Sequence, residues 1–531
     1  MKNELIIKIL LGAILVLALV LRVYKLDTIP PSISWDEAAV GYNAWTIANF
    51  GRDEYGNFFP AFFKSFADDK HPVHIYATAL FVKLLGLSEF STRLPSAVFG
   101  VFNVALLFFL AKVMFKNDYL GLLAAFFLAI SPYGIHFSHF NHEVNFALFF
   151  FLLGLVLFFK GIEKGNFLFP LSSLSFGLSV LAYHSSIVVV PLIILILTIL
   201  YFRKLLELKK LFIYSLVIIA FFVLIIATNP RLLGIARVQQ NVFSVERLHQ
   251  TKLYSLTRNE LLAWLEITYQ QYWWHFTPNF LFTIGDKNAR LSSQTGELYQ
   301  IDAIFLILGL FYLIYKRSRE GVVVLFWALI APLPSALVAE APHAARAMYM
   351  IGSWHLISAL GLYFSFTFIK KPLVKGILAT LTLIILIFSL KSYLSYYYGE
   401  YAKRYAIEWQ YGMKQIVEYV RDHPEYVQVY MTNVRSQPYI FFLYYLKTPL
   451  PDFLNSVIYN NGESKSYNTV AIFDRYYFEG WDPIESFPQR DILYIVTPSQ
   501  YDGLRHKAIF NIKKKVNYPN DLAAFYLVSV N

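Results

Sequence analysis

The chain contains no cysteine and few charged residues. None of its 531 residues is Cys, which excludes disulfide bonds, thiolate zinc sites and a cysteine nucleophile. Charged side chains make up 15% of the sequence, whereas soluble domains average about 25%. Asn-x-Ser/Thr sequons are also absent, which argues against a eukaryotic secretory protein. The chain therefore lacks the charge that a soluble protein of this length would carry on its surface.

Hydrophobic residues are abundant instead. They form 57% of the sequence, and apolar runs of helix-spanning length recur through the first 400 residues, which predicts a polytopic α-helical membrane protein. No small-residue cleavage site follows the first run, so we interpret it as a retained span rather than a signal peptide. Eleven spans are predicted, at residues 5–24, 94–111, 119–136, 144–159, 167–182, 185–202, 211–228, 301–315, 321–339, 347–369 and 376–395.

The basic residues are concentrated in short loops between alternate apolar runs. Together with the N-terminus, these loops hold 16 Lys and Arg against five acidic residues, an excess equal to the whole net charge of +11. Positive charge beside short loops marks the cytoplasmic side of a membrane. The basicity is therefore a topology signal, and nucleic acid is not expected as a partner. The loops in question are residues 112–118, 160–164, 203–210, 316–320 and 370–375.

This charge distribution predicts the topology of the chain. The N-terminus is expected in the cytoplasm of a prokaryotic cell, with a multi-pass domain (1–395) in the plasma membrane. Loops 26–93 and 229–300 are expected outside the membrane. The stretch 71–87 is too short and too interrupted to span, and counting it would invert the charge distribution. We predict that it is an amphipathic helix on the outer surface of the bilayer.

The last part of the chain changes character. A polar helix-like stretch at 407–423 is followed by β-type runs at 427–431, 469–473, 492–496 and 524–530. This alternation predicts a small extracytoplasmic α/β domain over residues 396–531. Nothing in it forms a recognisable catalytic constellation, so a structural role and a role in acceptor recognition both remain open.

Ionisable residues converge on the predicted outer face. Asp36 and Glu37 follow the first span, and the apolar side chains around them indicate that the pair needs a partner or a function. Glu143 stands at the mouth of another span, close to His142. Ionisable groups at the ends of several spans on one face indicate a site at the outer membrane surface. Further such groups are His71, His136 and His139, and those in "FLFTIGDKNAR" (280–290) and "PHAAR" (342–346).

Each of these residues also has a simpler interpretation. A loop carboxylate is often only solvated, and we prefer this for Asp53 and Asp68. Arg290 and Arg346 could be interfacial anchors, and the histidines could be interface aromatics. Glu143, His142 and His71 together could instead hold a divalent metal ion, since imidazole and carboxylate groups suit several such ions. Their spacing matches no strict zinc signature.

The order of these features resembles the C-type glycosyltransferases (GT-C) of the protein O-mannosyltransferase and lipid A aminoarabinose-transferase group, glycosyltransferase family 39 and its relatives. The most specific part is 68–100. The family carries Lys-Pro-Pro, an amphipathic helix, Gly-x-x-Glu and Arg-Leu-Pro-Ser there. This chain has Lys70-His71-Pro72, Gly86-Leu87-Ser88-Glu89 and Arg93-Leu94-Pro95-Ser96. The resemblance covers roughly residues 1–400. It implies the GT-C fold, with helices on the outer membrane surface.

Two departures from the family pattern stand out. His71 replaces the usual first proline, and Ala38-Ala39 follow the acidic pair where many relatives carry an arginine nearby. Arg93, Arg290 or Arg346 would have to replace that arginine.

The resemblance implies sugar transfer, with inversion, from a polyprenyl-phosphate-linked donor to a protein, lipid or glycan acceptor outside the bilayer. Such a reaction needs a base for the acceptor and cations for the leaving phosphate. We predict that Asp36 is the base, that Glu37 orients it or binds the sugar, and that Glu143 positions the acceptor or a metal. No cofactor other than that metal ion is expected. The predicted phosphate-binding residues are Lys70, Arg93, Arg290, His343 and Arg346.

Two other functions remain open. A transporter or flippase of lipid-linked sugars would place its polar site near the membrane midplane, whereas the acids here lie in outer loops. An oligosaccharyltransferase-like enzyme or glycan ligase would move a whole glycan. The oligosaccharyltransferases carry a Trp-Trp-Asp-type motif in their soluble domain, where this chain has only Gly480-Trp481-Asp482.

Overall fold

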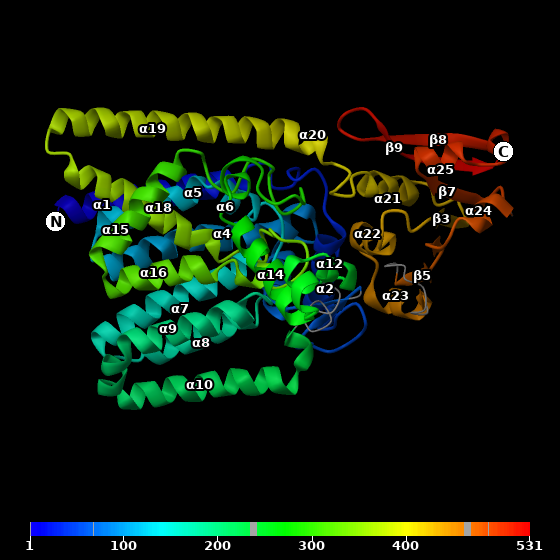
Figure 1. Ribbon diagram of the computed structural model, residues 1–531. Helices are drawn as coiled ribbons and strands as arrows, with labels where there is room; N and C mark the ends of the chain where they lie inside the picture. The colour runs from blue at the N-terminus through cyan, green and yellow to red at the C-terminus, as the bar shows by residue number, and fades with distance from the viewer. Residues whose placement is uncertain (1, 67, 234–241, 461–468, 487, 531) are drawn as a thin grey trace. The chain divides into compact units, whose positions relative to one another are not determined.

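The computed structural model describes the chain except for residues 1, 67, 234–241, 461–468, 487 and 531 (Figure 1). The chain divides into two compact units. Unit 1 comprises Met1–Tyr24 and Ser96–Ser395, and unit 2 comprises Lys25–Pro95 and Tyr396–Asn531. The first outer loop and the C-terminal region therefore belong to one unit, although about 300 residues of sequence separate them.

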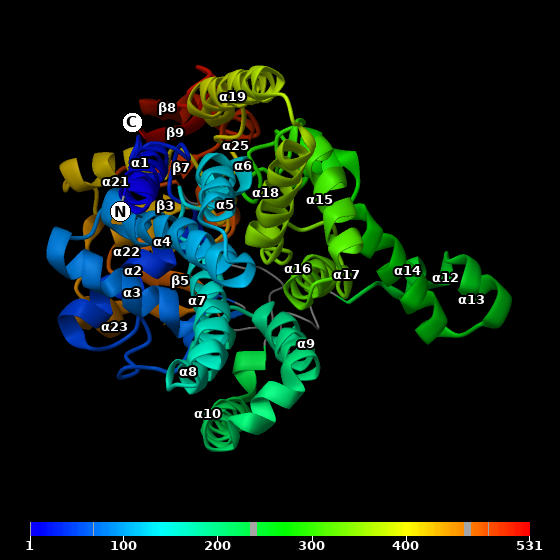
Figure 2. The same cartoon turned by 90° about the vertical axis from the view of Figure 1, so that its left-hand side faces the viewer.

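Unit 1 is helical. In Figure 2 its long helices are seen side by side and nearly end-on, while α12–α14 project away from them. The elements are α1 (Lys2–Val23), most of α4 (Glu89–Phe115), α5 (Asp118–Ile130), α6 (Pro132–His136), α7 (Val144–Lys164), α8 (Leu168–Val180), α9 (Ser186–Glu207), α10 (Lys209–Thr228), η1 (Pro230–Leu233), α12 (Val245–His249), α13 (Lys252–Thr257), α14 (Glu260–Trp274), η2 (Asn279–Thr283), α15 (Asp302–Lys316), α16 (Arg319–Ile330), α17 (Leu333–Ala336), α18 (Met350–Phe368) and α19 (Pro372–Ser395).

All eleven predicted spans fall on helices of unit 1. Seven helices, among the described residues, are long and apolar enough to cross a membrane: α1, α4, α7, α9, α10, the α16–α17 segment and α19. The apolar helices α5 and α8 have 13 residues each, whereas about 20 are needed to cross the hydrocarbon core. The chain is thus a membrane protein with several spanning helices.

Three predicted boundaries are corrected by local chemistry. The run 119–136 is broken after Ile130, where Ser131 caps a new short helix that begins at Pro132. The basic stretch 203–210 is mostly helical, because α9 continues to Glu207 and α10 begins at Lys209. The run 347–369 contains a kink at Ile351–Gly352, where Gly352 has a φ of 94°. Hydropathy alone does not register such breaks inside an apolar run.

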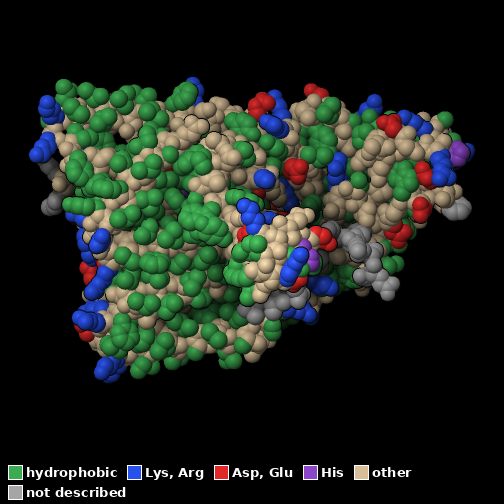
Figure 3. Space-filling model, viewed as in Figure 1, with side chains coloured by type: hydrophobic (Ala, Val, Ile, Leu, Met, Phe, Trp, Pro, Cys, Tyr) green, Lys and Arg blue, Asp and Glu red, His purple; other side chains and the backbone are tan. Residues whose placement is uncertain are grey.

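The basic connections of unit 1 gather at one end of its helices. In Figure 3 the flank of the helices is hydrophobic and Lys and Arg side chains line the left-hand end. Contacts join these connections to one another: Lys116 Nζ lies 2.5 Å from Glu163 Oε1, and Tyr201 Oη donates to Glu320 Oε1 at 2.9 Å. This clustering is what the predicted topology requires of loops on one side of the bilayer.

Unit 2 combines the first outer loop with an α/β domain. The loop forms α2 (Trp35–Phe50), the hairpin β1 (Phe63–Ser65) and β2 (Asp68–Lys70), and α3 (Pro72–Leu85). The helix predicted at 71–87 is therefore present as α3. One of its faces buries Ile75, Ala79 and Val82, while Leu80 and Leu84 are 67% and 81% exposed on the other. A helix with two apolar faces, one of them uncovered, is suited to the membrane surface.

The C-terminal part of unit 2 forms a seven-stranded sheet in the order β4-β5-β6-β3-β7-β9-β8. Strand β3 runs parallel to β6 and β7, and the other pairs are antiparallel. The elements are η3 (Tyr396–Tyr401), α20 (Ala402–Arg404), α21 (Met413–Asp422), β3 (Gln428–Met431), α22 (Pro438–Leu446), α23 (Leu450–Ser456), β4 (Ile458–Tyr459), β5 (Val470–Phe473), β6 (Tyr476–Tyr477), α24 (Asp482–Ser486), β7 (Ile492–Val496), α25 (Pro498–Asp502), η4 (Lys507–Ile509), β8 (Phe510–Asn517) and β9 (Ala523–Val530).

One hydrophobic core joins the loop to the α/β domain. It contains Val40 and Tyr42 of α2, Phe441 of α22 and Phe473 of β5. Buried polar contacts follow the same interface: Thr92 Oγ1 lies 2.8 Å from Tyr444 Oη, and Tyr42 Oη donates to the carbonyl of Thr448 at 2.8 Å. The helix that carries Asp36 and Glu37 is thus held by the C-terminal region.

Candidate active site

The two acidic residues of the opening loop lie in the first turn of α2. Ser34 caps this helix: the Glu37 amide donates to Ser34 Oγ at 3.3 Å, and the Ser34 amide donates to Glu37 Oε2 at 3.1 Å. This reciprocal pair is a capping box, which satisfies two amide groups that the helix itself leaves unpaired. The positive end of the helix dipole also favours carboxylates at this place. Local sequence therefore explains why both acids occupy a helix N-terminus.

Glu37 is bound into the interior by Arg93. Both side chains are at most 1% exposed. Arg93 Nε donates to Glu37 Oε1 at 2.9 Å and its NH2 group to Oε2 at 3.2 Å. The remaining guanidinium hydrogens go to the carbonyls of Leu26, Pro30 and Ser32, at 3.1, 3.0 and 2.6 Å. All five donors of Arg93 are engaged, which favours a structural role over the predicted phosphate contact.

Asp36 has different surroundings. Its side chain is 45% exposed and forms an ion pair with Lys70, whose side chain is only 11% exposed. Lys70 ends the β1–β2 hairpin, opposite Phe63, and the ring of Phe66 lies 5.9 Å from its ammonium. The hairpin thus presents one shielded cation to one accessible carboxylate. This pair joins two residues that the sequence predicted for different parts of the same reaction.

The residues proposed as metal ligands are divided between the units. His71 is buried at the start of α3 in unit 2. His142 and Glu143 belong to unit 1, where His142 Nδ1 lies 3.3 Å from Glu143 Oε2. Over the described part of the chain, no group of three or more His, Asp and Glu side chains is arranged to hold a metal ion. The carboxylate–imidazole pair of His142 and Glu143 could hold and orient a proton.

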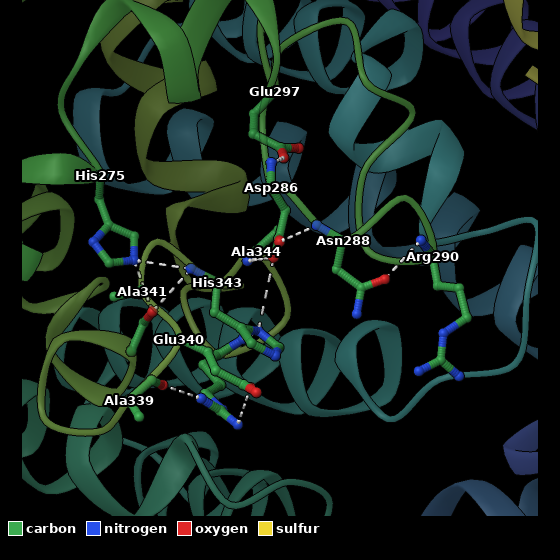
Figure 4. Close-up of polar contacts among 12 residues, drawn as sticks. His275, Asp286, Asn288, Arg290, Glu297, Ala339, Glu340, Ala341, His343 and Ala344 are labelled. Atoms are coloured by element: carbon green, nitrogen blue, oxygen red, sulfur yellow. Dashed lines mark hydrogen bonds and ion pairs between the residues drawn. The ribbon is translucent and has the colours of Figure 1, made fainter. Parts of the chain in front are cut away.

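A second polar cluster joins the two quoted loops of unit 1 (Figure 4). Asp286, which is 4% exposed, accepts from the amide of Asn288 at 2.8 Å and from that of Ala344 at 2.7 Å. His343 Nδ1 lies 4.0 Å from its Oδ2 atom. Glu297 Oε1 accepts from the Asp286 amide at 3.3 Å. Asp286 therefore connects the stretch 280–290 to the stretch 342–346.

The predicted phosphate-binding residues of unit 1 stand around this connection. The NH1 group of Arg346 donates to the carbonyl of Ala339 at 2.9 Å, and its NH2 group lies 3.6 Å from Glu340 Oε2. The side chain of Arg346 is 14% exposed, whereas that of Glu340 is 70% exposed. The carbonyl of Arg290 contacts His136 Nε2 at 2.9 Å. Arg290, His343 and Arg346 thus lie on loops that share one network of polar contacts.

Burial tunes the acids of this cluster. It raises the pKa of Asp286 to about 6. The amides of Asn288 and Ala344 donate to the carboxylate and lower this pKa, but their effect is smaller than that of burial. It holds the pKa of Glu297 well above its usual value. A buried carboxyl with a raised pKa is frequent at functional sites. The stretch 280–290 was selected from the sequence, but Asp286 itself was not, because its contact with the loop around Ala344 is visible only in the fold.

Comparisons with known proteins agree with this architecture. Residues 69–227 match the profile of the family described as dolichyl-phosphate-mannose-protein mannosyltransferase. The "Putative mannosyltransferase YkcB" of Bacillus subtilis (strain 168) is 31% identical over 175 residues, which cover 32% of this chain and 23% of that protein. The chain thus spans about a quarter of the length of this curated relative.

Two solved structures show the fold. ArnT from Cupriavidus metallidurans, bound to undecaprenyl phosphate, is similar over 98% of both chains, with a TM-score of 0.56 and 12% identity. The archaeal oligosaccharyltransferase AglB from Archaeoglobus fulgidus, in complex with an inhibitory peptide and a dolichol-phosphate, is similar over 82% of this chain and 63% of its own. Its TM-score is 0.51, with 16% identity.

The likeness defines the class of the protein. The chain is a membrane protein with the GT-C fold, which confirms the fold class predicted from the sequence. Within that class, it is similar over residues 69–227 to the dolichyl-phosphate-mannose-protein mannosyltransferases, and this is the region where the sequence resemblance is most specific.

Proposed function

We propose that the protein is a glycosyltransferase that moves one sugar from a polyprenyl-phosphate carrier to a hydroxyl acceptor on the extracytoplasmic face of the membrane. The observation that carries this proposal is the pair of Asp36 and Lys70. A half-exposed carboxylate at a helix N-terminus faces a shielded ammonium group. These are the two charges that transfer from a lipid phosphate requires: a base for the acceptor and a cation for the leaving group.

The reaction is a single displacement at the anomeric carbon. The acceptor oxygen forms a bond to this carbon as the bond between the carbon and the phosphate oxygen breaks. Asp36 takes the proton of the acceptor hydroxyl, and the polyprenyl phosphate leaves with the bonding electrons. The configuration at the anomeric carbon is inverted. Glu37, held by Arg93 and by the capping box, fixes the helix turn from which Asp36 projects.

Lys70 supplies the first positive charge for the donor. An incoming phosphate competes with Asp36 for the ammonium group, so donor binding releases the carboxylate from its ion pair. The base is then available only when a donor is bound. ArnT was solved with undecaprenyl phosphate and AglB with a dolichol-phosphate, which supports a lipid-phosphate donor for a chain of the same fold.

The sequence assigned Arg346 and His343, with Arg290, to phosphate binding, and these residues supply positive charge within unit 1. Arg346 is mostly buried and holds its exposed partner Glu340 at 3.6 Å, a contact that a phosphate can replace. An arginine binds phosphate in a bidentate manner, which adds geometric specificity to the attraction. Glu143 with His142 would position the acceptor or a divalent ion. The loops that carry these residues lie outside the membrane in the predicted topology, in which the positively charged loops are cytoplasmic.

Two alternative functions predict different products from a lipid-linked donor. An oligosaccharyltransferase-like enzyme would accept a lipid-linked oligosaccharide, and the likeness to AglB is compatible with this. A flippase would move the lipid-linked sugar without changing it. The product distinguishes the three functions: a glycoside of one sugar, a glycoside of an oligosaccharide, or an unchanged donor.

The test is transfer from polyprenyl-phosphate-mannose by the full chain in detergent, where no gradient exists. Asp36→Asn should reduce the rate by about 10²–10⁴-fold, the usual contribution of a general base. Lys70→Ala should chiefly weaken donor binding. The matched controls are Asp27→Asn and Lys64→Ala, both exposed residues of the same unit. Full activity of Asp36→Asn, or unchanged donor affinity of Lys70→Ala, would remove these roles.

A further inference from the structure

A cavity lies among α7, α8, α9 and α10 of unit 1, and none of its lining residues belongs to the proposed catalytic or phosphate-binding sites. It has a volume of about 110 Å³. Three of its lining residues, Phe169, Leu205 and Phe212, stand in the first or last turn of α8, α9 and α10. The cavity therefore reaches the basic end of the helices, which the predicted topology places on the cytoplasmic side.

The packing of α10 explains why the cavity is there. This helix stands at the edge of unit 1 (Figure 1), and of its own residues only Ser215 and Phe222 are buried. Phe222 packs so closely on α8 that a Cβ atom at Gly177 would lie 2.2 Å from its ring. Nearer the basic end, Leu216 lines the cavity and is still 48% exposed. The cavity is thus open toward the outer flank of the helices, where hydrocarbon chains of a bilayer lie.

The walls of the cavity are suited to hydrocarbon. Most of the lining side chains are Phe, Leu and Ile. Three of its four hydroxyl groups, those of Ser172, Thr198 and Ser215, donate to carbonyls three or four residues earlier in their own helices, at 2.6, 2.8 and 3.1 Å. Their hydrogens are therefore already used. Dry cavities of comparable size, roughly 150 Å³, accept small hydrocarbon groups.

A cluster of positive charge stands at the same end of α9 and α10. A single residue separates the two helices, so Arg203 and Lys204 of α9 are close in sequence to Lys209 and Lys210 of α10. All four side chains are exposed. Lys204 forms an ion pair with Glu207 at 2.8 Å. The other three basic side chains form no ion pair with the residues that the structure describes, so they can bind an anion.

These two features together select the chemistry of the ligand. An acyl chain suits the walls of the cavity, and an anionic head group suits the basic residues beside it. Basic pockets between spanning helices on the cytoplasmic side of a membrane bind anionic lipid head groups. We infer that the cavity holds an acyl chain of an anionic phospholipid, whose phosphate binds Arg203, Lys209 and Lys210. Such a lipid would fill the space beside α10 and connect this helix to α9.

The test is lipid binding to the full chain in detergent after removal of bound lipid. It needs no sugar donor and is therefore independent of the proposed transfer. Dioleoyl-phosphatidylglycerol and dioleoyl-phosphatidylcholine, which have the same acyl chains, are titrated and followed by native mass spectrometry. The anionic lipid should form one saturable adduct, at least tenfold tighter than that of the zwitterionic lipid.

Two kinds of variant separate the head group from the chain. The triple variant Arg203→Gln/Lys209→Gln/Lys210→Gln should weaken the phosphatidylglycerol adduct by about tenfold or more, because each basic side chain near an anionic lipid adds to the attraction. Thr198→Phe keeps these charges and places a ring in the cavity. It should also weaken the adduct, because the acyl chain then has less room.

Each variant has a matched control. Lys370→Gln/Lys371→Gln/Lys375→Gln removes the same charge from exposed residues of another basic connection and should bind phosphatidylglycerol like the wild type. Val217→Phe adds a ring to α10 at a residue that is 62% exposed and does not line the cavity, and it should bind likewise.

Three results would overturn the inference. The first is equal binding of the two lipids by the wild-type chain, and the second is an equal loss in a variant and its control. The third is displacement of phosphatidylglycerol by undecaprenyl phosphate at a tenfold lower concentration, which would assign the cavity to a polyprenyl lipid.

Discussion

Two adjacent carboxylates on α2 have opposite surroundings. The side chain of Asp36 is 45% exposed and that of Glu37 is 1% exposed. The capping box and Arg93 saturate Glu37 with hydrogen bonds, so it holds the helix turn and has little freedom to react. Asp36 is accessible to a substrate, and a phosphate can displace it from its ion pair with Lys70. Because of this difference, we assign a structural role to Glu37 and a catalytic role to Asp36.

The buried pair of Glu37 and Arg93 should be essential for stability. Arg93→Ala leaves a carboxylate buried without its cation, and we expect a loss of about 3–5 kcal/mol in the free energy of unfolding. Lys70→Ala removes a partly exposed pair and should cost about 1 kcal/mol or less. Thermal unfolding in detergent by tryptophan fluorescence compares the two. A stable Arg93→Ala variant that fails to bind the donor would instead support the phosphate contact that the sequence suggested.

Glu54 should make the stability of unit 2 depend on pH. It is fully buried, which raises its pKa to about 7, and it accepts hydrogen bonds from Asn43 and Tyr439. A raised pKa means that the folded chain holds the proton more tightly than the unfolded chain. Its contribution is therefore fully present below the ordinary value of 4.5 and is lost as the pH rises toward 7. Asp53 and Tyr55 are the other ionisable groups beside it.

Glu54→Gln mimics the protonated form at every pH. Between pH 4.5 and 8, its stability relative to the wild type should rise by roughly 3 kcal/mol. Chemical denaturation at several pH values measures this difference, and the comparison cancels the titration of all other groups. A constant difference across the range would show that Glu54 stays ionised in the folded chain.

At the scale of elements, the sequence predicted the helices and strands whose residues form a clear local pattern. Apolar runs located the helices of unit 1, and alternating runs located β3, β5, β7 and β9. Strand β8 was missed because "FNIKKKVN" contains three consecutive lysines. Exposed side chains alternate with buried or half-buried ones in the strand that pairs with β9, where Lys514 is half-buried between exposed Lys513 and Lys515. The break at Ser131 was hidden inside an apolar run. These errors arise where a cap or a distant strand overrides hydropathy.

The candidate site was predicted to a similar degree. Asp36, Lys70, His343 and Arg346 were selected from motif order, but pairing between distant residues is not encoded in any local window. The structure adds the contact of Lys70 with Asp36 and that of Glu37 with Arg93. Asp286 was not selected, since nothing in the sequence shows that the loop around Ala344 approaches it. The contacts between residues far apart in the sequence are the part of the candidate site that can be identified only from the fold.

Asp286 should act by positioning the loop that carries His343 and Arg346. Asp286→Ala removes the acceptor for the Ala344 amide, so we expect the KM for the lipid donor to rise by about tenfold, the cost of one charged hydrogen bond, with a smaller change in kcat. Asp286→Asn keeps an acceptor oxygen and should be milder. Glu260→Gln, at a side chain 61% exposed on α14 of the same unit, is the control. A loss confined to kcat and equal in both Asp286 variants would point to direct participation in the reaction.

At the scale of the whole molecule, the first outer loop and the C-terminal region form one folded unit. They share a core and the contacts of Thr92 with Tyr444 and of Glu54 with Tyr439. In addition, Lys414 Nζ lies 3.0 Å from Glu89 Oε1. The C-terminal region therefore has a structural role, because it covers the face of α2 that would otherwise expose apolar side chains.

This shared core predicts the result of truncating the chain after Ser395. A separable acceptor module could be removed while the loop stayed folded and transfer to some acceptor continued. In the observed arrangement, truncation exposes the face of α2 that packs on α22, so residues 26–93 should become sensitive to protease and transfer should be lost for every acceptor. Limited proteolysis in detergent, with mass spectrometry of the fragments, measures the first effect.

Tyr444→Ala tests the same interface in the full chain. Tyr444 is 2% exposed and contacts Thr92, and truncating a buried aromatic side chain to alanine costs about 3–5 kcal/mol. Leu522→Ala, at a residue 65% exposed in the turn between β8 and β9, is the control and should leave the loop protected. Cleavage of the loop should be equal in the wild type and Leu522→Ala, faster in Tyr444→Ala and fastest in the truncated chain. A truncated chain with a protected loop and normal transfer would show instead that the C-terminal region only selects acceptors, because the base on α2 would then hold its place without the core observed here.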